Sequence, residues 1–250
     1  MKNHLRKKSY KIVLIFAYLF ASINIVCGQK TTIYCFPGQG ADKRLFDSIR
    51  VDSTLFELEF VEYGTPEYSM DMKSFAWSLI DRIDTTKPYI LLGVSLGGML
   101  CVELTERFNP EKTIIVSSAK NTNELPYMYR FQKKVPLYEF LPKKILYEGA
   151  KIMQPLMEPD RNKNKETFKS MLSEKDPTYM ERTIALIINW ERETNTKKVY
   201  QIHGTNDRTL PLRFIQNTDF VVENASHMMT LTHGREVSRI LKYILLGGKM

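Results

Sequence analysis

The residues of this chain most able to do chemistry lie in the segment Gly93-Val94-Ser95-Leu96-Gly97-Gly98. A mostly apolar run, residues 88–93, ends there, and a second one, residues 99–108, follows at once. A Gly-x-Ser-x-Gly pattern between a strand and a helix places its serine on a strained turn that exposes the hydroxyl. We therefore predict that Ser95 is a nucleophile and that the backbone N–H of Leu96 helps to stabilise an oxyanion.

A serine hydroxyl becomes a good nucleophile only when a neutral imidazole takes its proton, and a carboxylate then holds that imidazole in the required tautomer. Both groups follow strand-like runs further along the chain. Asp207 closes the segment Tyr200-Gln201-Ile202-His203-Gly204-Thr205-Asn206-Asp207, and His227 closes Glu223-Asn224-Ala225-Ser226-His227. Ser95, Asp207 and His227 thus occur in the chain order nucleophile, acid, base.

Several other polar residues compete for these roles or for a metal. Glu124, beyond the strand that ends near Val116, is an alternative acid. His203 and His233 each precede a glycine and suit a structural role, while Asp42 suits the first turn of a helix. The four histidines lack the paired spacing of metal ligands, and no phosphate-binding or dinucleotide-binding glycine loop is present. We therefore expect neither a metal nor a cofactor.

Hydrophobic periodicity predicts the elements that must position these residues. Strands are expected over residues 31–36, 56–63, 88–93, 113–116, 199–203 and 220–222, with further helices over 41–50, 70–83 and 237–246. Alternating strands and helices favour right-handed crossovers and a mainly parallel sheet with helices on both faces. Each motif named above follows the carboxyl end of a strand, where such sheets bind their ligands.

The alternation stops between Ser117 and Lys198, an interval too long for an ordinary connection. Helical patterns fill it over residues 127–134, 141–153, 165–172 and 177–190. Asp176 and Pro177 are typical of the start of the last of these helices. We expect residues 121–197 to form a helical cap insertion over the active end of the sheet, and residues 29–120 and 198–250 to form the α/β core.

The chain resembles the α/β-hydrolase superfamily, in particular its small, cap-bearing, esterase-like serine hydrolases, over residues 31–248. The resemblance rests on Phe36-Pro37-Gly38-Gln39-Gly40, Gly93-Val94-Ser95-Leu96-Gly97-Gly98, Ile202-His203-Gly204-Thr205-Asn206-Asp207 and Asn224-Ala225-Ser226-His227. It implies that Ser95 is the nucleophile, His227 the general base and Asp207 the orienting acid. It also implies a second oxyanion donor in the loop after the first strand, the backbone N–H of Gln39 or, as the fallback, of Gly40.

The sequence departs from the family pattern in two ways. Many relatives carry His-Gly in the loop after the first strand, where this chain has Pro37-Gly38. Because the oxyanion donor is a backbone group, the chemistry does not depend on that side chain, although the shape of the loop does. The first two strands common in the superfamily are missing, which leaves an expected sheet of about six strands with a helical cap insertion.

The first 28 residues are typical of an export signal. Five Lys and Arg precede an uncharged, largely apolar run over residues 12–26, and Gly28 offers a cleavage point. The run is shorter than the roughly 20 apolar residues of a membrane-spanning helix. We expect the mature protein, from Gln29 on, to be secreted or periplasmic without a stable membrane span. An uncleaved N-terminal anchor and lipid attachment at Cys27 remain alternatives.

Removing that segment changes the charge of the chain. The whole sequence has 36 Lys and Arg against 28 Asp and Glu, a net charge of +8. Without the first 28 residues it has 31 basic residues against the same 28 acidic ones, a net charge of +3. The basic character belongs largely to the export segment, so we expect no nucleic-acid partner. Cys35 and Cys101 are too few for a disulfide framework and are expected to be buried free thiols.

The predicted activity is cleavage of a carboxylic ester or thioester through an acyl-enzyme on Ser95. The expected substrate is a small molecule with an apolar group, because methionines and aromatic residues are frequent over residues 121–197 and Met228 and Met229 adjoin His227. Most of the apolar residues in 121–197 should nevertheless serve packing. An acyltransferase or peptidase with the same three residues, and a noncatalytic binding protein on the same scaffold, remain alternatives. The sequence pattern identifies no substrate contact.

Overall fold

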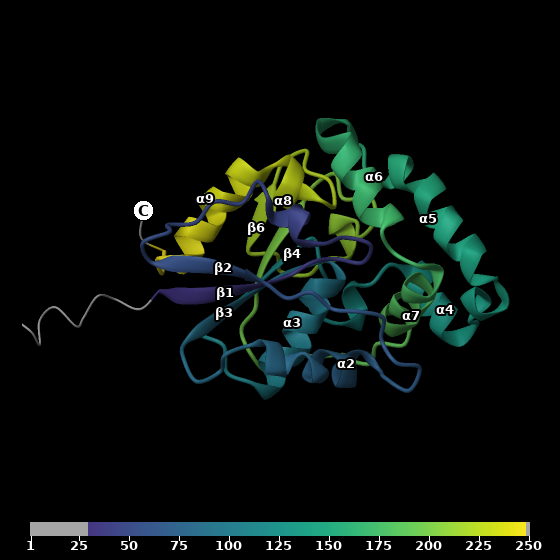
Figure 1. Cartoon of the computed structure of the whole chain (residues 1–250), viewed down its shortest axis with the longest axis horizontal. Helices are drawn as coiled ribbons and strands as arrows, with labels where there is room; N and C mark the ends of the chain where they lie inside the picture. Colours follow the sequence, from purple (N-terminus) through teal and green to yellow (C-terminus); the bar gives the residue numbers. More distant parts are fainter. Residues whose placement is uncertain (1–29, 249–250) are drawn as a thin grey trace, which may run out of the picture. The chain divides into compact units, whose positions relative to one another are not determined.

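A computed structural model describes residues 30–248; the predicted export segment, with Cys27 and Gly28, lies outside the described residues. Six strands form one sheet in the order β2-β1-β3-β4-β5-β6, and every neighbouring pair is parallel (Figure 1). The strands are β1 (Thr31–Phe36), β2 (Phe56–Phe60), β3 (Tyr89–Val94), β4 (Lys112–Val116), β5 (Tyr200–Gly204) and β6 (Phe220–Val222). The prediction of a mainly parallel sheet of about six strands is confirmed.

Alternate residues of one central strand face two separate cores. Ile33 and Cys35 of β1 belong to the cluster that includes the inner side of α9 (Gly234–Leu245). Tyr34 and Phe36 belong to the cluster formed with α2 (Met72–Ser78) and α3 (Leu96–Arg107). Successive side chains of a strand point to opposite faces, so the sheet is covered on both sides. Figure 1 shows α9 on one side of the sheet and α2 and α3 on the other.

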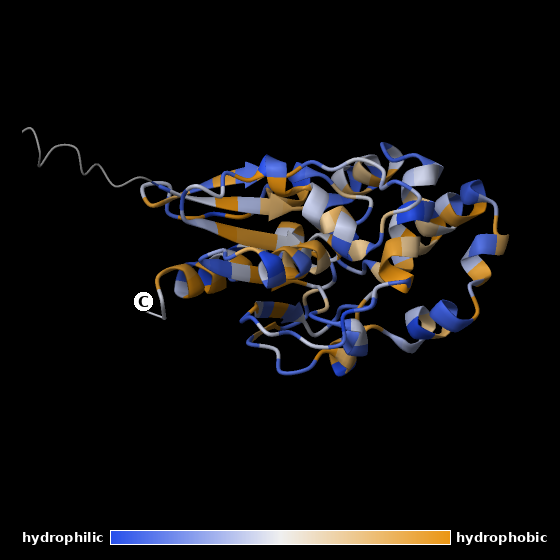
Figure 2. Ribbon diagram, turned by 90° about the horizontal axis from the view of Figure 1, so that it is seen from below, coloured by the Kyte–Doolittle hydropathy of each residue, from blue (hydrophilic) through white to orange (hydrophobic). Residues whose placement is uncertain are grey.

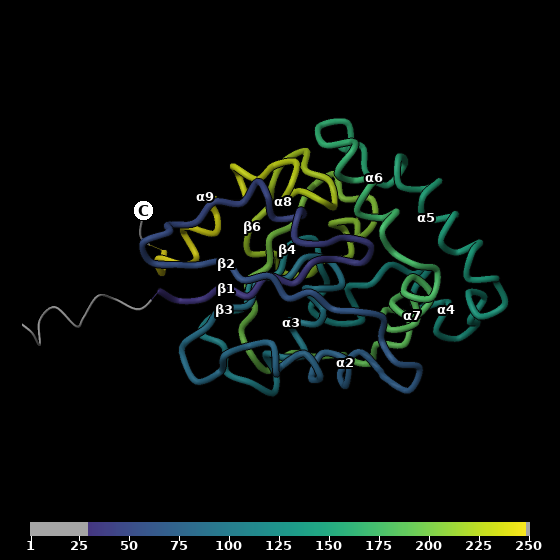
Figure 3. The backbone as a smooth tube through the Cα atoms, in the orientation of Figure 1, coloured from purple at the N-terminus to yellow at the C-terminus, as the bar shows by residue number. Residues whose placement is uncertain are grey.

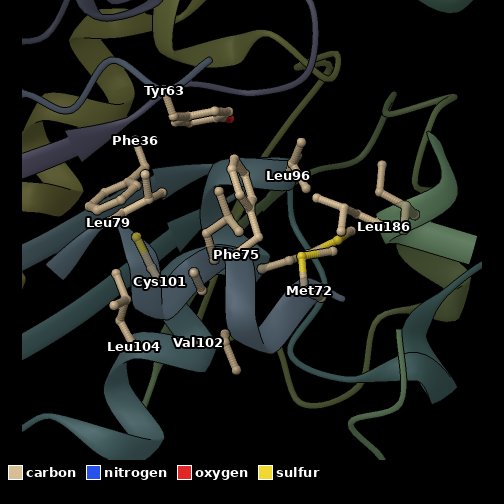
Figure 4. Packing of buried hydrophobic residues seen from close by; sticks show 14 of the residues in the cluster. Phe36, Tyr63, Met72, Phe75, Leu79, Leu96, Cys101, Val102, Leu104 and Leu186 are labelled. Atoms are coloured by element: carbon tan, nitrogen blue, oxygen red, sulfur yellow. The ribbon is translucent and has the colours of Figure 1, made fainter. Parts of the chain in front are cut away.

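The core beneath α2 and α3 is built from large apolar side chains. Figure 4 shows Phe75 of α2 lying between Phe36 and Leu96, and Met72 lying toward Leu96 and Leu186. Complete burial of a side chain such as that of Phe36 contributes roughly 1.5–3 kcal/mol. Figure 2 shows largely hydrophobic central strands and outer helices on which hydrophobic and hydrophilic residues are mixed. This pattern is what a two-sided α/β sheet requires.

Residues 41–50 do not form the predicted α-helix. Only a short 3-10 turn, η1 (Lys43–Phe46), is present, and the carboxylate of Asp42 accepts the backbone N–H of Arg44 at its start (2.9 Å). Leu45, Phe46 and Ile49 are buried, so the apolar spacing reflects burial of an irregular segment rather than an α-helix. The backbone at Ser48 packs directly against the start of α9, which an α-helix through this position would disturb.

The predicted helix over residues 70–83 is also divided. α2 ends at Ser78, and a 3-10 turn, η2 (Ile80–Arg82), follows it. The start of α2 is sharply defined, because Asp71 and Ser74 form a reciprocal capping box. At the far end of the chain, a one-turn helix, α8 (Met229–Thr232), precedes α9.

Four helices separate β4 from β5, as the sequence predicts. They are α4 (Tyr127–Lys134), α5 (Lys143–Met157), α6 (Lys165–Ser173) and α7 (Pro177–Ile188), and α5 extends past its expected end at residue 153. Short 3-10 turns accompany them: η3 (Thr122–Glu124), η4 (Leu137–Phe140), η5 (Arg161–Asn164) and, after β5, η6 (Leu212–Phe214). Figures 1 and 3 show α4–α7 on the side of the sheet where the strands end.

The last part of this insertion is tied to the core by a buried carboxylate. Glu103 of α3 is 2% exposed and accepts hydrogen bonds from Trp190 Nε1 (2.7 Å) and from Arg192 Nε and Nη2 (2.8 and 2.7 Å). A buried charge needs such partners, so the chain leaving α7 has a fixed path back to β5. Over residues 30–248, we find no helix with the length and apolar character needed to cross a membrane.

Candidate active site

Ser95 lies on the turn between β3 and α3 in a strained backbone conformation. Its φ is 53° and its ψ −122°, a combination that residues other than glycine seldom adopt. Its N–H donates to the carbonyl of Val116 in β4 (3.1 Å), and its carbonyl accepts from the N–H of Gly98 (2.9 Å) and the hydroxyl of Ser118 (2.7 Å). The strained turn is thus held by the neighbouring strand and by the first turn of α3.

His227 lies between Ser95 and Asp207. Its Nε2 is 2.8 Å from Ser95 Oγ, and its Nδ1 is 2.8 Å from Asp207 Oδ2. An ionised carboxylate only accepts hydrogen bonds, so Nδ1 carries the proton and donates it to Asp207. In the neutral ring Nε2 is then the acceptor for the Ser95 hydroxyl. The three predicted residues, from the turn after β3 and the segments after β5 and β6, therefore meet in the arrangement of a nucleophile, a base and an orienting acid.

Asp207 is surrounded by donors. Its side chain is buried, its Oδ1 accepts the N–H groups of Thr209 (2.9 Å) and Leu210 (2.8 Å), and its Oδ2 lies 3.3 Å from His203 Nε2. Burial by itself would raise the pKa of Asp207. The charge of protonated His227 and the hydrogen-bond donors lower this pKa by more than burial raises it. The pKa of Asp207 therefore lies well below its ordinary value, and the side chain stays ionised at neutral pH.

His227 is also buried, with 7% of its surface exposed. Burial lowers the pKa of His227, but the Asp207 carboxylate, its hydrogen bond and the charge of Glu158 raise it, and the raising effects prevail. A base with a raised pKa attracts the hydroxyl proton of Ser95 more strongly. The same ring is protonated, and unable to act as a base, up to a higher pH than an ordinary histidine.

Two backbone N–H groups are available beside the Ser95 hydroxyl. Those of Leu96, the first residue of α3, and of Gln39 have no hydrogen-bond acceptor within residues 30–248. A helix start leaves such donors unpaired. A Cβ built on Gly38 would lie 3.1 Å from Ser95 Cβ, so the loop that contains Gln39 passes directly beside the serine. Both predicted oxyanion donors are thus located around one side chain.

The loop after β1 is a tight turn. The carbonyl of Gly38 accepts the N–H of Ala41 (3.1 Å), and Gly40, the third residue of the turn, has a φ of +74°. A type II turn requires a positive φ at this position, which explains the glycine. The buried hydroxyl of Tyr63 donates to the carbonyl of Pro37 and so fixes the backbone at the start of the loop. The Pro37-Gly38 departure from the common family pattern is therefore compatible with an ordered loop.

The same loop contacts the insertion. Gln39 Nε2 donates to Thr183 Oγ1 of α7 (2.7 Å), and Thr183 Oγ1 donates to the carbonyl of Tyr179 (2.7 Å). A Cβ on Gly40 would lie 2.9 Å from Leu172 of α6. The helices between β4 and β5 thus touch the loop that carries one of the predicted oxyanion donors.

Glu124, the alternative acid, has other partners. It is fully buried and accepts the N–H of Lys120 (2.7 Å), the N–H of Gln216 (3.2 Å) and Nε2 of Gln201 (3.0 Å). Its carboxylate therefore links the segment that follows β4 to Gln201 of β5 and to the backbone at Gln216. The imidazole of His227 is bonded to Asp207 instead.

Of the other histidines in residues 30–248, His203 and His233, neither contacts Ser95. His203 Nε2 is 2.7 Å from the carbonyl of Leu210 and 3.3 Å from Asp207 Oδ2, so this nitrogen faces two acceptors and must carry a proton. His203 thereby supports the same oxygen of Asp207 that accepts the proton of His227 Nδ1. His233 precedes α9, with its Nδ1 3.7 Å from Asp160 Oδ2.

Two residues near the site were missed by sequence reasoning. Ser118 bonds the carbonyl of Ser95, and its position directly after β4, at the carboxyl end of a strand, is a signal that could have been used. Glu158 is 5% exposed at the end of α5, and its Oε2 lies 3.3 Å from the backbone N of Met228. Nothing local to Glu158 in the sequence indicates that it reaches a segment 70 residues away.

The apolar residues expected near the site divide into two groups. In the insertion, Tyr138, Tyr147, Met171, Met180 and Trp190 are buried, whereas Tyr127, Met128, Phe131, Phe140 and Met153 are exposed. Met229, two residues after His227, is fully buried and belongs to the core cluster that includes α9. Within the described part of the chain, we find no group of three or more metal-ligating His, Cys, Asp or Glu side chains. Cys35 and Cys101 are buried free thiols.

Comparison with known proteins gives similarity in structure only. No family model matches the amino-acid sequence, and none of the curated proteins matches it. Among solved structures, the chain is similar to a thermophilic esterase from Thermogutta terrifontis, with a TM-score of 0.66 and 16% identity over 89% of this chain and 92% of the esterase. An enol-lactonase from Burkholderia xenovorans matches with a TM-score of 0.65 and 14% identity, covering 88% of this chain and 92% of the lactonase.

A third similar structure is an esterase from Exiguobacterium antarcticum, with a TM-score of 0.64 and 14% identity over 87% of this chain and 92% of that chain. The TM-scores establish a shared fold, whereas sequence identities this low leave the activity open. Together with the six-stranded parallel sheet, these similarities show that the chain has the α/β-hydrolase fold.

Proposed function

We propose that this chain is a serine hydrolase that cleaves a carboxylic ester or thioester through an acyl-enzyme on Ser95. The observation that carries the proposal is the hydrogen-bond chain from Ser95 Oγ through His227 to Asp207, with both distances at 2.8 Å. The partly exposed serine beside a buried base and acid suits a nucleophile that is activated by proton removal. The α/β-hydrolase fold shared with two esterases and an enol-lactonase supports the same class of reaction.

In the proposed reaction, Ser95 Oγ attacks the carbonyl carbon of the substrate while His227 Nε2 takes the hydroxyl proton. The oxyanion of the tetrahedral intermediate accepts hydrogen bonds from the N–H groups of Leu96 and Gln39, each worth roughly 10²–10³ in rate. The imidazolium returns the proton to the leaving alcohol or thiol as its bond to the carbonyl carbon breaks. A water molecule, deprotonated by His227, then attacks the acyl-enzyme, and the imidazolium returns this proton to Ser95 Oγ as its bond to the acyl carbon breaks and the acid leaves.

Asp207 has two roles in this scheme. Its ionised carboxylate fixes the tautomer in which Nε2 of His227 accepts a proton, and it stabilises the imidazolium that forms during attack. The lowered pKa of Asp207, which arises because its hydrogen-bond donors and the charge on His227 outweigh burial, supports this assignment. The donors Thr209, Leu210 and His203 hold the carboxylate in place before substrate binds.

The proposal extends to the insertion over residues 121–197, which we assign as a cap that selects the substrate. α6 and α7 contact the loop at Gln39 and Gly40, and the guanidinium of Arg208 donates to the carbonyl of Leu156 at the end of α5 (2.9 Å). The exposed apolar side chains of α4 and α5 offer a surface for the apolar group of a small-molecule substrate. The first 28 residues are proposed to direct export to a secreted or periplasmic location, and Gln29 as the first residue of an isolated mature protein would support this.

A fluorophosphonate probe tests the central assignment, because it reacts with a serine that is activated by a base. We expect the protein to be labelled, Ser95→Ala to be unlabelled, and Ser118→Ala to be labelled because its own hydroxyl only supports the turn. Labelling that persists unchanged in Ser95→Ala would overturn the proposal. A panel of p-nitrophenyl esters and thioesters with different acyl lengths, analysed for free acid and for transferred acyl group, then separates hydrolysis from acyl transfer.

A further inference from the structure

The segment that follows α5 binds the backbone on both sides of His227. Glu158 Oε2 lies 3.3 Å from the N of Met228, and Asp160 Oδ2 lies 3.2 Å from the N of Ser226. The two carboxylates thus accept the N–H groups of the residues directly before and after His227. Both come from the insertion, whereas His227 belongs to the core. The position of the imidazole therefore depends on a contact between the insertion and the core.

The two carboxylates differ in their surroundings. Glu158 is 5% exposed, and the ionisable groups that act on it are His227 and Asp207. Asp160 is more accessible, and Lys163 (3.9 Å) and His233 (3.7 Å) lie beside its carboxylate. Arg161 directly follows Asp160, and the guanidinium of Arg208 bonds the carbonyl of Leu156. Of the two acids, Glu158 is thus the one whose charge acts on the proposed base.

We propose that Glu158 is a positioning residue for His227, which it holds through the backbone N–H of Met228 and whose protonated form its negative charge stabilises. This inference rests on the proposed serine hydrolase function, in which His227 is the base. Asp207 contacts Nδ1 directly, and Glu158 supplies a second negative charge that acts on the same ring. Because Glu158 belongs to the insertion, any movement of the end of α5 would change both the position and the basicity of the imidazole.

The electrostatics of Glu158 agree with this geometry. Burial raises the pKa of Glu158 to about 7, and the negative charge of Asp207 adds to the rise, while His227 and the N–H of Met228 oppose it. The charge of Glu158 is in turn one of the influences that raise the pKa of His227. Near neutral pH the two groups therefore influence one another, and an ionised Glu158 favours the imidazolium that forms when Ser95 is deprotonated.

Three variants test the proposal. Glu158→Gln removes the charge but keeps an oxygen that accepts the N–H of Met228. Glu158→Ala removes both the charge and the acceptor. Asp160→Asn is the matched control, because it neutralises the acid that bonds the N–H of Ser226, and the charge of Asp160 is not among the influences on the pKa of His227. The measurements are kcat/KM against pH with an ester substrate, the pKa of the His227 imidazole from NMR of ¹⁵N-histidine protein, and thermal unfolding as a check of folding.

We expect the pKa of His227 and the acid limb of kcat/KM to move to lower pH in Glu158→Gln, with a plateau only a few-fold lower, because the imidazolium that forms during attack loses one stabilising charge. Glu158→Ala should show the same shift and a loss of about tenfold in plateau kcat/KM, because the N–H of Met228 loses its acceptor. Asp160→Asn should leave the pKa of His227 unchanged. The proposal is overturned if Glu158→Gln leaves that pKa at the wild-type value, or if Asp160→Asn shifts it equally. The NMR titration needs no turnover, so it separates failure of this inference from failure of the proposed function.

Discussion

The α-carbon of Gly97 lies against the carbonyl oxygen of Phe36, so closely that any Cβ at Gly97 would overlap it. Gly97 is in the first turn of α3, two residues after the serine, and Phe36 is the last residue of β1. Their contact sets the end of β1 beside the helix start. It therefore determines where the loop with Gln39 leaves the sheet relative to Ser95.

A side chain at Gly97 should disrupt this arrangement. Gly97→Ala must push the backbone at Phe36 and Pro37 away, and we expect a loss of at least about 3 kcal/mol in the free energy of unfolding. Gly149→Ala is the control, because Gly149 lies inside α5 with no atom near its Cβ position. That change should stabilise the protein by about 0.5–1 kcal/mol. Urea unfolding followed by circular dichroism measures both, and equal stabilities for the two variants would contradict the prediction.

Asp207→Asn should abolish most of the activity without unfolding the protein. An amide at this position permits the wrong tautomer of His227, and a loss of about 10⁴ in kcat is expected for such a change. Glu124→Gln, at the alternative acid, should keep kcat within a few-fold of wild type, although it disturbs buried hydrogen bonds. A larger loss of kcat in Glu124→Gln than in Asp207→Asn would reverse the assignment of the acid.

The pH dependence of the wild-type enzyme follows from the pKa of His227. Only the neutral ring takes the proton of Ser95, so activity falls as the pH drops through this pKa. Although burial lowers the pKa of His227, the Asp207 carboxylate raises it more, so the midpoint of the acid limb should lie above the ordinary value of 6.5. The check is kcat/KM from about pH 5 to about pH 9 with a non-ionising ester. A midpoint below 6.5 would contradict the prediction.

The hydrogen bond between Gln39 and Thr183 should couple the insertion to the oxyanion loop. Gln39→Ala and Thr183→Val each remove one partner of a 2.7 Å contact, and each should lower kcat/KM by several-fold through misplacement of the Gln39 N–H. Because both lose the same bond, the double variant should be about as active as either single one, with a coupling energy of about 1 kcal/mol. Strictly additive effects would show that the bond does not position the loop.

Much of the fold was predictable because its signals are local. The period of apolar residues located all six strands and the four helices between β4 and β5, and the bounds of α4 agree with the prediction. Asp176 and Pro177 marked the start of α7, where the Asp176 carboxylate accepts the N–H groups of Thr178 and Tyr179. The segment over residues 41–50 misled the same reasoning, because its apolar spacing arises from packing against α9 and not from a helical backbone.

The amino-acid sequence by itself determined the alternation of strands and helices and the serine turn, because backbone propensity and turn chemistry act over neighbouring residues. It also shows the order of Ser95, Asp207 and His227 directly. Only the tertiary structure decided which carboxylates meet His227. Glu124 and Glu158 both lie between β4 and β5 in the chain, yet one is bound to Gln201 and the other reaches Met228. Such contacts depend on the order of the strands and on how the insertion folds back over them, which no local pattern encodes.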